Sequence, residues 1–249
     1  MNAVKGCTSS YEAPDESLHV TSVPERSLQE RVGIGTGWIC AGICLITLII
    51  WLSLNLSVHW AGSMEGWVID QETGNPIEGV IVSANWQSEI RLPDGSRPGD
   101  QIAIREAVSD RTGHFRLDSW GPKFSTRRHA PERKPQLLLF KSGYEYRRVN
   151  EDVFPRRLGM KRFNGNLEAY AAHLTGLSSA LESPTGIMEG GCDWRELPLM
   201  LRALDEQDTM FRVERLRPLT LTASLRMAEK FYLERGCGSV EALLLKGRK

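Results

Sequence analysis

The amino-acid sequence predicts a mainly β protein that carries a single transmembrane helix near its N-terminus and ends in a short α-helical part. Three observations support this fold class. Residues 38–58 form one apolar run without a charged side chain. Residues 64–150 alternate short β-rich runs with turn-forming clusters, and residues 163–249 place apolar side chains at helical spacing.

The N-terminal tail, residues 1–36, precedes the apolar run. Ser, Glu and Pro are frequent in residues 1–31, and the apolar side chains there follow no period. Such a composition buries too little apolar surface to offset the entropy lost on ordering the chain. We therefore expect a disordered tail, and a docking peptide within it is the alternative.

The apolar run predicts a transmembrane helix over residues 37–60. It reads WICAGICLITLIIWLSLNLSV from Trp38 to Val58. A helix of this length spans about 30 Å, the thickness of the hydrocarbon core of a bilayer. Trp38 and Trp60 suit the two membrane interfaces. A buried core helix would be polar on one face, and a cleaved signal peptide would have a shorter leading segment and a shorter apolar core.

The charges that flank the apolar run predict its orientation. Arg26 and Arg31 lie just before it, and no Lys or Arg follows until Arg91. Basic residues close to a membrane helix favour the cytoplasmic side, whereas charges inside a distant folded domain count little. The sequence thus predicts a single-pass protein of the bacterial inner membrane, with a cytoplasmic N-terminus and a periplasmic C-terminal domain.

Residues 64–150 predict an antiparallel β-sandwich of six or seven short strands. Turns are expected at residues 70–76 and 110–113, where Gly, Pro, Asn and Asp gather. Residues 88–100 contain two prolines and two glycines and are expected to form a polar loop. The expected strands are 66–69, 79–86, 102–108, 115–117, 137–140 and 146–149.

Four motifs follow one another in this region: Gly66-x-Val68-x-Asp70, Thr73-Gly74-x-Pro76-Ile77-x-Gly79-Val80-x-Val82, Val108-x-Asp110-x-x-Gly113-x-Phe115 and Gly143-Tyr144. Their order resembles the carboxypeptidase regulatory-like domain. The resemblance covers residues 64–150 and implies a seven-stranded antiparallel sandwich of the transthyretin-like (prealbumin-like) type. It also implies an accessory or adhesive module rather than a catalytic domain. The insert at 88–104 and the basic loop at 121–135 depart from a minimal member.

Three short helices are expected in the C-terminal part, near residues 167–177, 194–204 and 221–232. Cys192 precedes the second helix and Cys237 follows the third. In an oxidising compartment a disulfide between them would fasten the two helix ends. Two separate buried thiols are the alternative.

Local charge is uneven although the formal net charge of the chain is zero. Residues 91–162 carry an excess of Lys and Arg over Asp and Glu. This basic stretch could contact anionic lipid headgroups or another acidic surface, or it could be a solvated face that keeps the protein soluble. No nucleic-acid-binding motif accompanies it, so no nucleic-acid partner is expected.

Motifs of catalysis are missing from the sequence. It contains no HExxH, no CxxC, no GxSxG and no GxGxxG, so neither an enzyme nor a bound cofactor or metal is expected. The favoured function is a membrane-anchored, non-catalytic scaffold or protein-interaction module that faces the periplasm and binds an envelope protein.

A glycan- or cell-envelope-binding module is the main alternative function. Trp86, Trp120 and Tyr144, together with Tyr146, could offer stacking faces to a sugar. The same rings could instead fill the core of the sandwich. A hydrolase with a dispersed active site is a third hypothesis.

Overall fold

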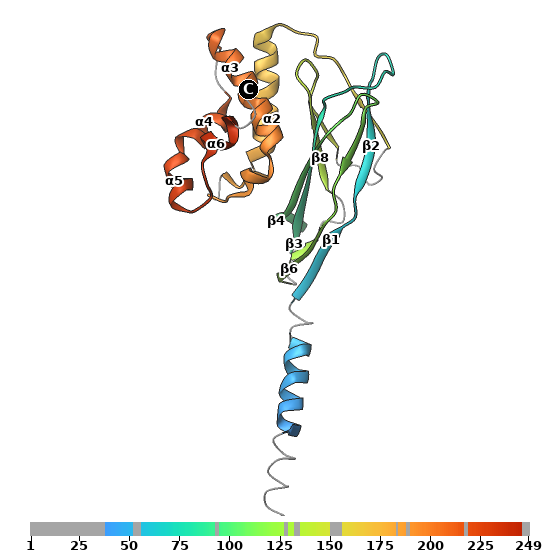
Figure 1. Cartoon of the computed structure of the whole chain (residues 1–249), viewed down its shortest axis with the longest axis vertical. Coiled ribbons are helices and arrows are strands. Elements are labelled where there is room, and N and C mark those ends of the chain that lie inside the picture. Colours follow the sequence, from blue (N-terminus) through green and yellow to red (C-terminus); the bar gives the residue numbers. More distant parts are fainter. Residues whose placement is uncertain are drawn as a thin grey trace, which may run out of the picture. The chain divides into compact units, whose positions relative to one another are not determined.

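The computed structural model describes residues 38–51, 56–92, 95–126, 129–131, 135–149, 156–182, 184–187, 190–216 and 219–245 (Figure 1). The chain divides into two compact units, Met1–Leu52 and Ser53–Lys249. The predicted tail over residues 1–36 lies outside the described residues. The β-rich and helical parts of the sequence both belong to the second unit.

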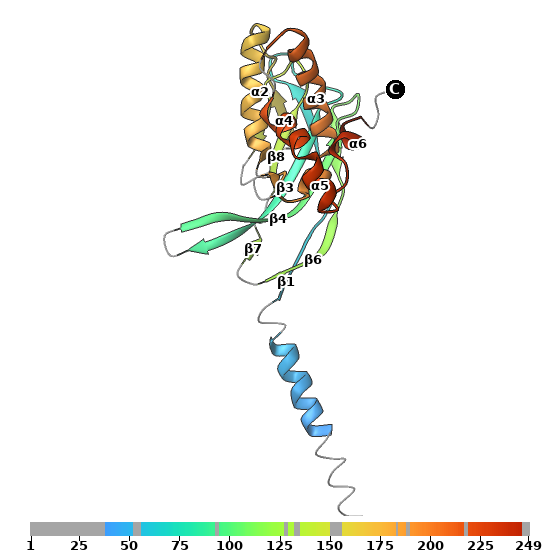
Figure 2. The ribbon, with the colours of Figure 1, turned by 90° about the vertical axis from the view of Figure 1, so that its left-hand side faces the viewer.

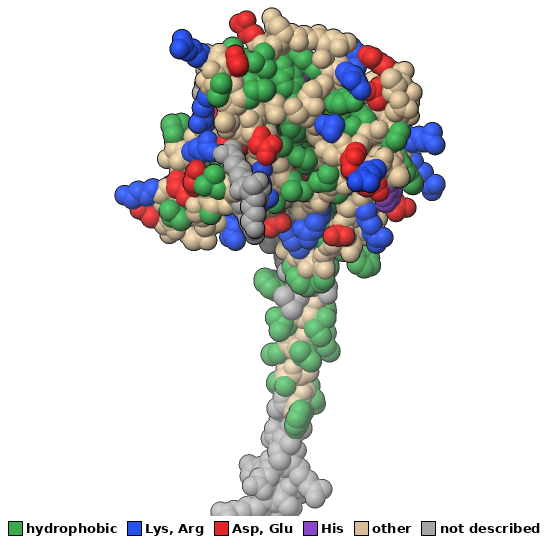
Figure 3. Space-filling view, turned by 45° about the horizontal axis from the view of Figure 1, so that its top comes forward, with side chains coloured by type: hydrophobic (Ala, Val, Ile, Leu, Met, Phe, Trp, Pro, Cys, Tyr) green, Lys and Arg blue, Asp and Glu red, His purple; other side chains and the backbone are tan. Residues whose placement is uncertain are grey.

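The first unit contributes one helix, over residues 38–51. Its large apolar side chains are exposed, among them Trp38, Ile46 and Trp51. Figure 3 shows apolar side chains along the side of the helix that faces the viewer. The hydroxyl of Thr47 donates a hydrogen bond to the carbonyl oxygen of Cys44 at 2.9 Å. No helix in the described ranges combines the length and the apolar character needed to cross a membrane.

The prediction of a transmembrane helix over residues 37–60 is therefore wrong. The described helix ends at residue 51, and strand β1 (Leu56–Ala61) occupies the last part of the predicted range. Over 38–51 the helical rise gives about 21 Å, less than a hydrocarbon core. An apolar run alone does not distinguish helix from strand, and here the pairing of β1 with β6 decides for strand.

In the described residues of the second unit, ten strands form three sheets. A two-stranded ribbon pairs β1 with β6, a three-stranded sheet has the order β10-β2-β5, and a five-stranded sheet has the order β4-β3-β8-β9 with β7 beside β3. The bounds are β2 (Met64–Asp70), β3 (Ile81–Leu92), β4 (Gly95–Val108), β5 (His114–Leu117), β6 (Trp120–Thr126), β7 (His129–Pro131), β8 (Gln136–Phe140), β9 (Arg147–Val149) and β10 (Arg157–Met160).

The expected seven-stranded antiparallel sandwich is wrong in strand number and in strand direction. β10 pairs with β2 in parallel, from Arg157 opposite Trp67 to Met160 opposite Asp70. The expected polar loop at 88–100 is instead the tip of the β3–β4 hairpin, which projects from the sheet in Figure 2. Pro98 does not prevent pairing, because it lies in β4, at a sheet edge, where a missing N–H is tolerated.

The five-stranded sheet is buried on both faces. Val82, Ala84 and Leu139 pack toward the three-stranded sheet, in a core that includes Val68 and Phe115. On the opposite face Ile104, Leu138 and Phe140 pack toward the helices. The continuous run Leu137–Phe140 is buried throughout, as expected for a strand covered on both sides.

The second unit is therefore mixed α/β rather than mainly β. Its helices cover one face of the five-stranded sheet (Figures 1 and 2). Across the described residues of the whole chain, helices and strands contain similar numbers of residues. The helices are α2 (Leu167–Glu182), the 3-10 helix η2 (Asp193–Glu196), α3 (Pro198–Val213), α4 (Thr220–Met227), α5 (Glu229–Glu234) and α6 (Val240–Leu245).

Two backbone groups hold α2 against the turn that follows β8. The amide of Gly143 donates to the hydroxyl oxygen of Tyr170 at 3.1 Å, and the amide of Tyr146 donates to Nε2 of His173 at 3.2 Å. Because the helical core also contains Leu138 and Phe140 from β8, the helices and the sheet share one hydrophobic core. The helical part is thus packed on the sheet rather than a separate bundle.

Candidate functional site

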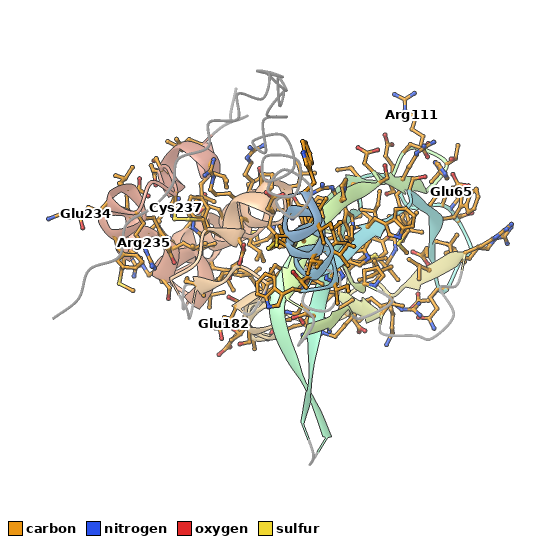
Figure 4. All side chains as sticks on the ribbon, turned by 90° about the horizontal axis from the view of Figure 1, so that it is seen from below. Glu65, Arg111, Glu182, Glu234, Arg235 and Cys237 are labelled. Carbon is orange, nitrogen blue, oxygen red and sulfur yellow. A yellow bond between two sulfur atoms is a disulfide. The ribbon has the colours of Figure 1, made fainter. Side chains whose placement is uncertain are left out.

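Cys192 and Cys237 form a disulfide in the helical part. The two Cα atoms lie 5.3 Å apart and the residues are 45 positions apart in the sequence. Cys237, labelled in Figure 4, follows α5 and is 1 % exposed, while Cys192 directly precedes η2. The bond fixes the end of α5 against the segment that leads into α3.

An apolar groove of about 540 Å³ opens beside this disulfide-linked region. It lies between the C-terminal end of α2, the segment around Ile187, and the helices α4 and α5. Its lining is mainly apolar, and its polar side-chain groups are the carboxylate of Glu182 and the hydroxyls of Ser224 and Tyr232. The remaining lining residues are Ile187, Gly190, Leu221, Ala228 and Phe231.

Arg235 fixes one wall of this groove. Its Nη1 donates to the carbonyl oxygen of Gly190 at 2.7 Å, and its guanidinium carbon lies 5.1 Å from the centre of the Phe231 ring. Gly190 has φ 67°, and a Cβ there would lie 2.7 Å from Nη1 of Arg235. The positive φ favours glycine at this position. Phe231 remains 44 % exposed, and burial raises the pKa of its neighbour Tyr232.

Glu106 ties the helices to the sheet. From β4, its two carboxylate oxygens accept the backbone amides of Leu199 and Met200, at 2.7 and 2.8 Å, in the first turn of α3. Burial raises the pKa of Glu106 to about 7, against the opposing effect of the two amides and of Arg202. The carboxyl group therefore caps α3 while sitting in a poorly solvated place.

The buried carboxylates of Asp205 and Asp208 fix the position of helix α4 beside the groove. Asp205 pairs with Nη2 of Arg226 at 2.8 Å, and Nε of Arg226 lies 3.4 Å from Oε2 of Glu241. Asp208 pairs with Arg212 and accepts the amide of Leu219 at 2.8 Å, just before α4. These contacts fix the position of α4, which forms part of the groove wall.

The rings considered for sugar stacking do not form a binding face. Trp86 and Trp120 are 4 % and 7 % exposed and pack edge to face, with centroids 5.4 Å apart, inside the core between the sheets. Tyr146 is half-buried against His173. The stacking interpretation is corrected for the two tryptophans, because they pack against apolar side chains from both sheets.

Tyr144, the third stacking candidate, belongs to a structural cluster. Its hydroxyl donates to Oδ2 of Asp70 at 3.2 Å, and Arg162 lies over its ring at 5.6 Å. Asp70 also accepts the amide of Thr73 and Nε of Arg162, which lower its pKa to about 2. This cluster holds the turn after β2 against the residues that follow β10.

Metal-binding chemistry finds no support in the described ranges, which contain no group of three or more His, Cys, Asp or Glu side chains that could hold an ion. His114 pairs with Glu65 at 3.6 Å, and His59, in β1, is buried. The side chains of His19 and His129 lie outside the described residues. The expectation of a non-catalytic protein stays a prediction.

Comparisons with known proteins do not assign a family. No family model matches the chain, and no curated protein matches it. A solved structure, a 9R-lipoxygenase from Cyanothece PCC8801, is similar over 68 % of this chain and 30 % of that chain, at 13 % identity and a TM-score of 0.21. A likeness this weak carries no argument, and the resemblance to the carboxypeptidase regulatory-like domain stays a prediction.

The groove residues were not identified from the sequence. Glu182, Ile187 and Phe231 come from three segments that show only the ordinary apolar spacing of helices and loops. One signal was available: Phe231 and Tyr232 are adjacent, so a helix that buries one ring turns the other toward a different face. Tyr232 is 1 % exposed and Phe231 is the open member of the pair.

Proposed function

We propose that this chain is a non-catalytic protein-interaction module of the cell envelope, held at a lipid bilayer by its apolar segment 38–51. Its docking site is the groove between α2, α4 and α5. The observation that carries this proposal is the groove itself, an apolar depression of about 540 Å³ with a single carboxylate among its side chains. Its size falls within the range of binding pockets in proteins.

The lining defines the chemistry of the partner. Leu221, Ala228 and Phe231 offer apolar contact area, and an exposed aromatic ring next to a pocket is typical of a protein interface. Glu182 would pair with a basic side chain, and Ser224 can exchange a hydrogen bond. The expected ligand is a segment of another protein that presents one large apolar side chain close to a Lys or Arg.

Two features support a location in the envelope. A disulfide such as Cys192–Cys237 persists in oxidising compartments. The helix over residues 38–51 exposes apolar side chains on all faces, a surface that favours contact with lipid. We propose that the Ser53–Lys249 unit lies on the oxidising side. A cytoplasmic N-terminus and a periplasmic domain remain predictions.

Photo-crosslinking in intact cells tests the groove. A photoreactive phenylalanine analogue replaces Met227, which is 81 % exposed at the end of α4, next to the groove residue Ala228. Val213, 75 % exposed at the end of α3, provides the matched control position. We expect one discrete adduct from position 227 and none of that mass from position 213.

A second substitution makes this test specific for the groove. Ala228→Trp places a large ring in the depression and should abolish the adduct from position 227, while circular dichroism of the purified chain stays unchanged. An adduct that persists in the Ala228→Trp variant, or that contains a second copy of this chain, would show that the groove is not the docking site for another protein.

A further inference from the structure

The β1–β6 ribbon has two different faces. The register places Val58 opposite Phe124 and His59 opposite Lys123. Directly opposed residues of an antiparallel pair point to the same side, so Val58 and Phe124 share one face, and His59 and Lys123 share the other. Trp60 follows Val58 by two positions, at the point where the register shifts between His59 and Ala61, and alternation along β1 places it on the face of Val58.

Exposure shows which face is turned to the domain. His59 is 3 % exposed, and Nζ of Lys123 donates to the carbonyl oxygen of Ile102, in β4, at 2.6 Å. On the other face Val58 is 58 % exposed, Phe124 64 % and Trp60 80 %. Tryptophan is ordinarily among the well-buried residues, so this open apolar face is unusual for a surface in contact with water only.

The exposed position of Trp60 is part of the ribbon's structure. Gly121 lies against it with φ 113°, and a Cβ at Gly121 would come within 2.8 Å of Cα of Trp60. The two backbones can approach this closely only because Gly121 lacks a side chain. The indole is therefore carried by strand β1, between the paired residues His59 and Ala61.

We propose that the face formed by Val58, Trp60 and Phe124 inserts into the interfacial region of the lipid bilayer and so orients the second unit on the membrane surface. This inference rests on the bilayer attachment of segment 38–51 proposed above. Val58 follows Trp51 by seven residues, a distance of at most about 25 Å even if the chain is fully extended. A bilayer that holds the segment is thus within reach of the ribbon.

The chemistry of this face fits the interface better than it fits water. Aromatic rings, and tryptophan in particular, settle at the level of the lipid headgroups. An apolar surface adds to the binding in proportion to the area it buries there. Since Lys123 is engaged with the domain, its charge lies on the opposite face from the apolar side chains and does not have to be desolvated when that face inserts.

Fluorine NMR of the full chain tests this orientation. All seven tryptophans of the sequence lie in described residues, so uniform 5-fluorotryptophan labelling gives one reporter at each place. The chain is reconstituted in nanodiscs of phosphatidylethanolamine and phosphatidylglycerol, with and without headgroup-spin-labelled lipid. We expect Trp60 to lose most of its signal, as Trp38 and Trp51 do, while the buried Trp86 and Trp194 keep theirs.

The outcomes separate this inference from the proposed function. Loss at Trp38 and Trp51 with an unchanged Trp60 would keep the bilayer attachment and overturn the ribbon contact. No loss at any of the three would overturn both. Trp60 could also lose signal only because segment 38–51 holds the second unit near the bilayer. The double variant Val58→Ser and Phe124→Ser separates this case from insertion, because removal of the apolar side chains should restore the Trp60 signal if the face inserts. If Trp60 stays as broadened as in the unchanged chain, the apolar face does not hold it at the membrane.

Discussion

Removal of the Cys192–Cys237 bond should weaken the helical part strongly. The bond joins residues 45 positions apart, and the chain-entropy relation gives about 4 kcal/mol for a loop of that length at 25 °C. Cys237 is 1 % exposed, so a replacement also leaves a small void. The expected change is therefore a loss of about 4 kcal/mol in the free energy of unfolding of the Cys192→Ala, Cys237→Ala variant.

Urea unfolding of the detergent-solubilised full chain measures this loss, followed by tryptophan fluorescence, because Trp194 lies two positions after Cys192 and is 1 % exposed. The matched control is the Cys40→Ala, Cys44→Ala variant, since both of these thiols are free and exposed. A loss smaller than about 1 kcal/mol, or an equal loss in the control, would refute the reasoning, because the loop-closure entropy would then not stabilise the helical part.

Two further predictions concern the contact between the sheet and the helices. Folding raises the pKa of Glu106 from its ordinary 4.5 to about 7, so its contribution to the free energy of unfolding should fall by about 3 kcal/mol as the pH rises from 4.5 to 7. Glu106→Gln should remove that part of the dependence in urea titrations at several pH values; an unchanged profile would contradict the assignment. Leu138→Ala and Leu139→Ala should each cost about 2–5 kcal/mol, because they face different cores. A nearly neutral Leu138→Ala in the same assay would mean that the helices do not cover the sheet.

Several strands and turns could be predicted because their signals are local. The run Leu137–Phe140 is apolar without interruption, which indicates a strand buried on both faces. The turn at 110–113 has an acidic residue that caps it: Asp110 accepts the amides of Thr112 and His114, at 2.8 and 3.0 Å. Gly113 has φ 74°, as its place in the turn requires.

Other elements depend on partners distant in the sequence and could not be predicted. β10 lies in a basic stretch without a β-rich run, and it becomes a strand because β2 offers it a free edge. The residues of β1 continue an apolar run, which predicts a helix. Their pairing with β6 makes them a strand instead. In the same way, Leu138 signals burial but not whether a second sheet or a helix buries it.

The groove shows the same limit for a site. Glu182 ends one helix and Phe231 sits in another, and nothing in the spacing between them indicates that they line one depression. The disulfide partners could be paired by counting cysteines, because in the C-terminal part only Cys192 and Cys237 were available. The groove is lined by common residue types from separate segments, so no count of a rare residue type indicates it in the sequence.

The parallel pairing of β2 with β10 has a consequence for the order in which the chain can fold. Trp67 pairs with Arg157, so the three-stranded sheet stays incomplete until about ninety further residues have been synthesised. β5 can join β2 earlier, because β5 precedes β10 in the sequence, but the edge that β10 covers remains open meanwhile. Final closure of the sheet is thus a late event.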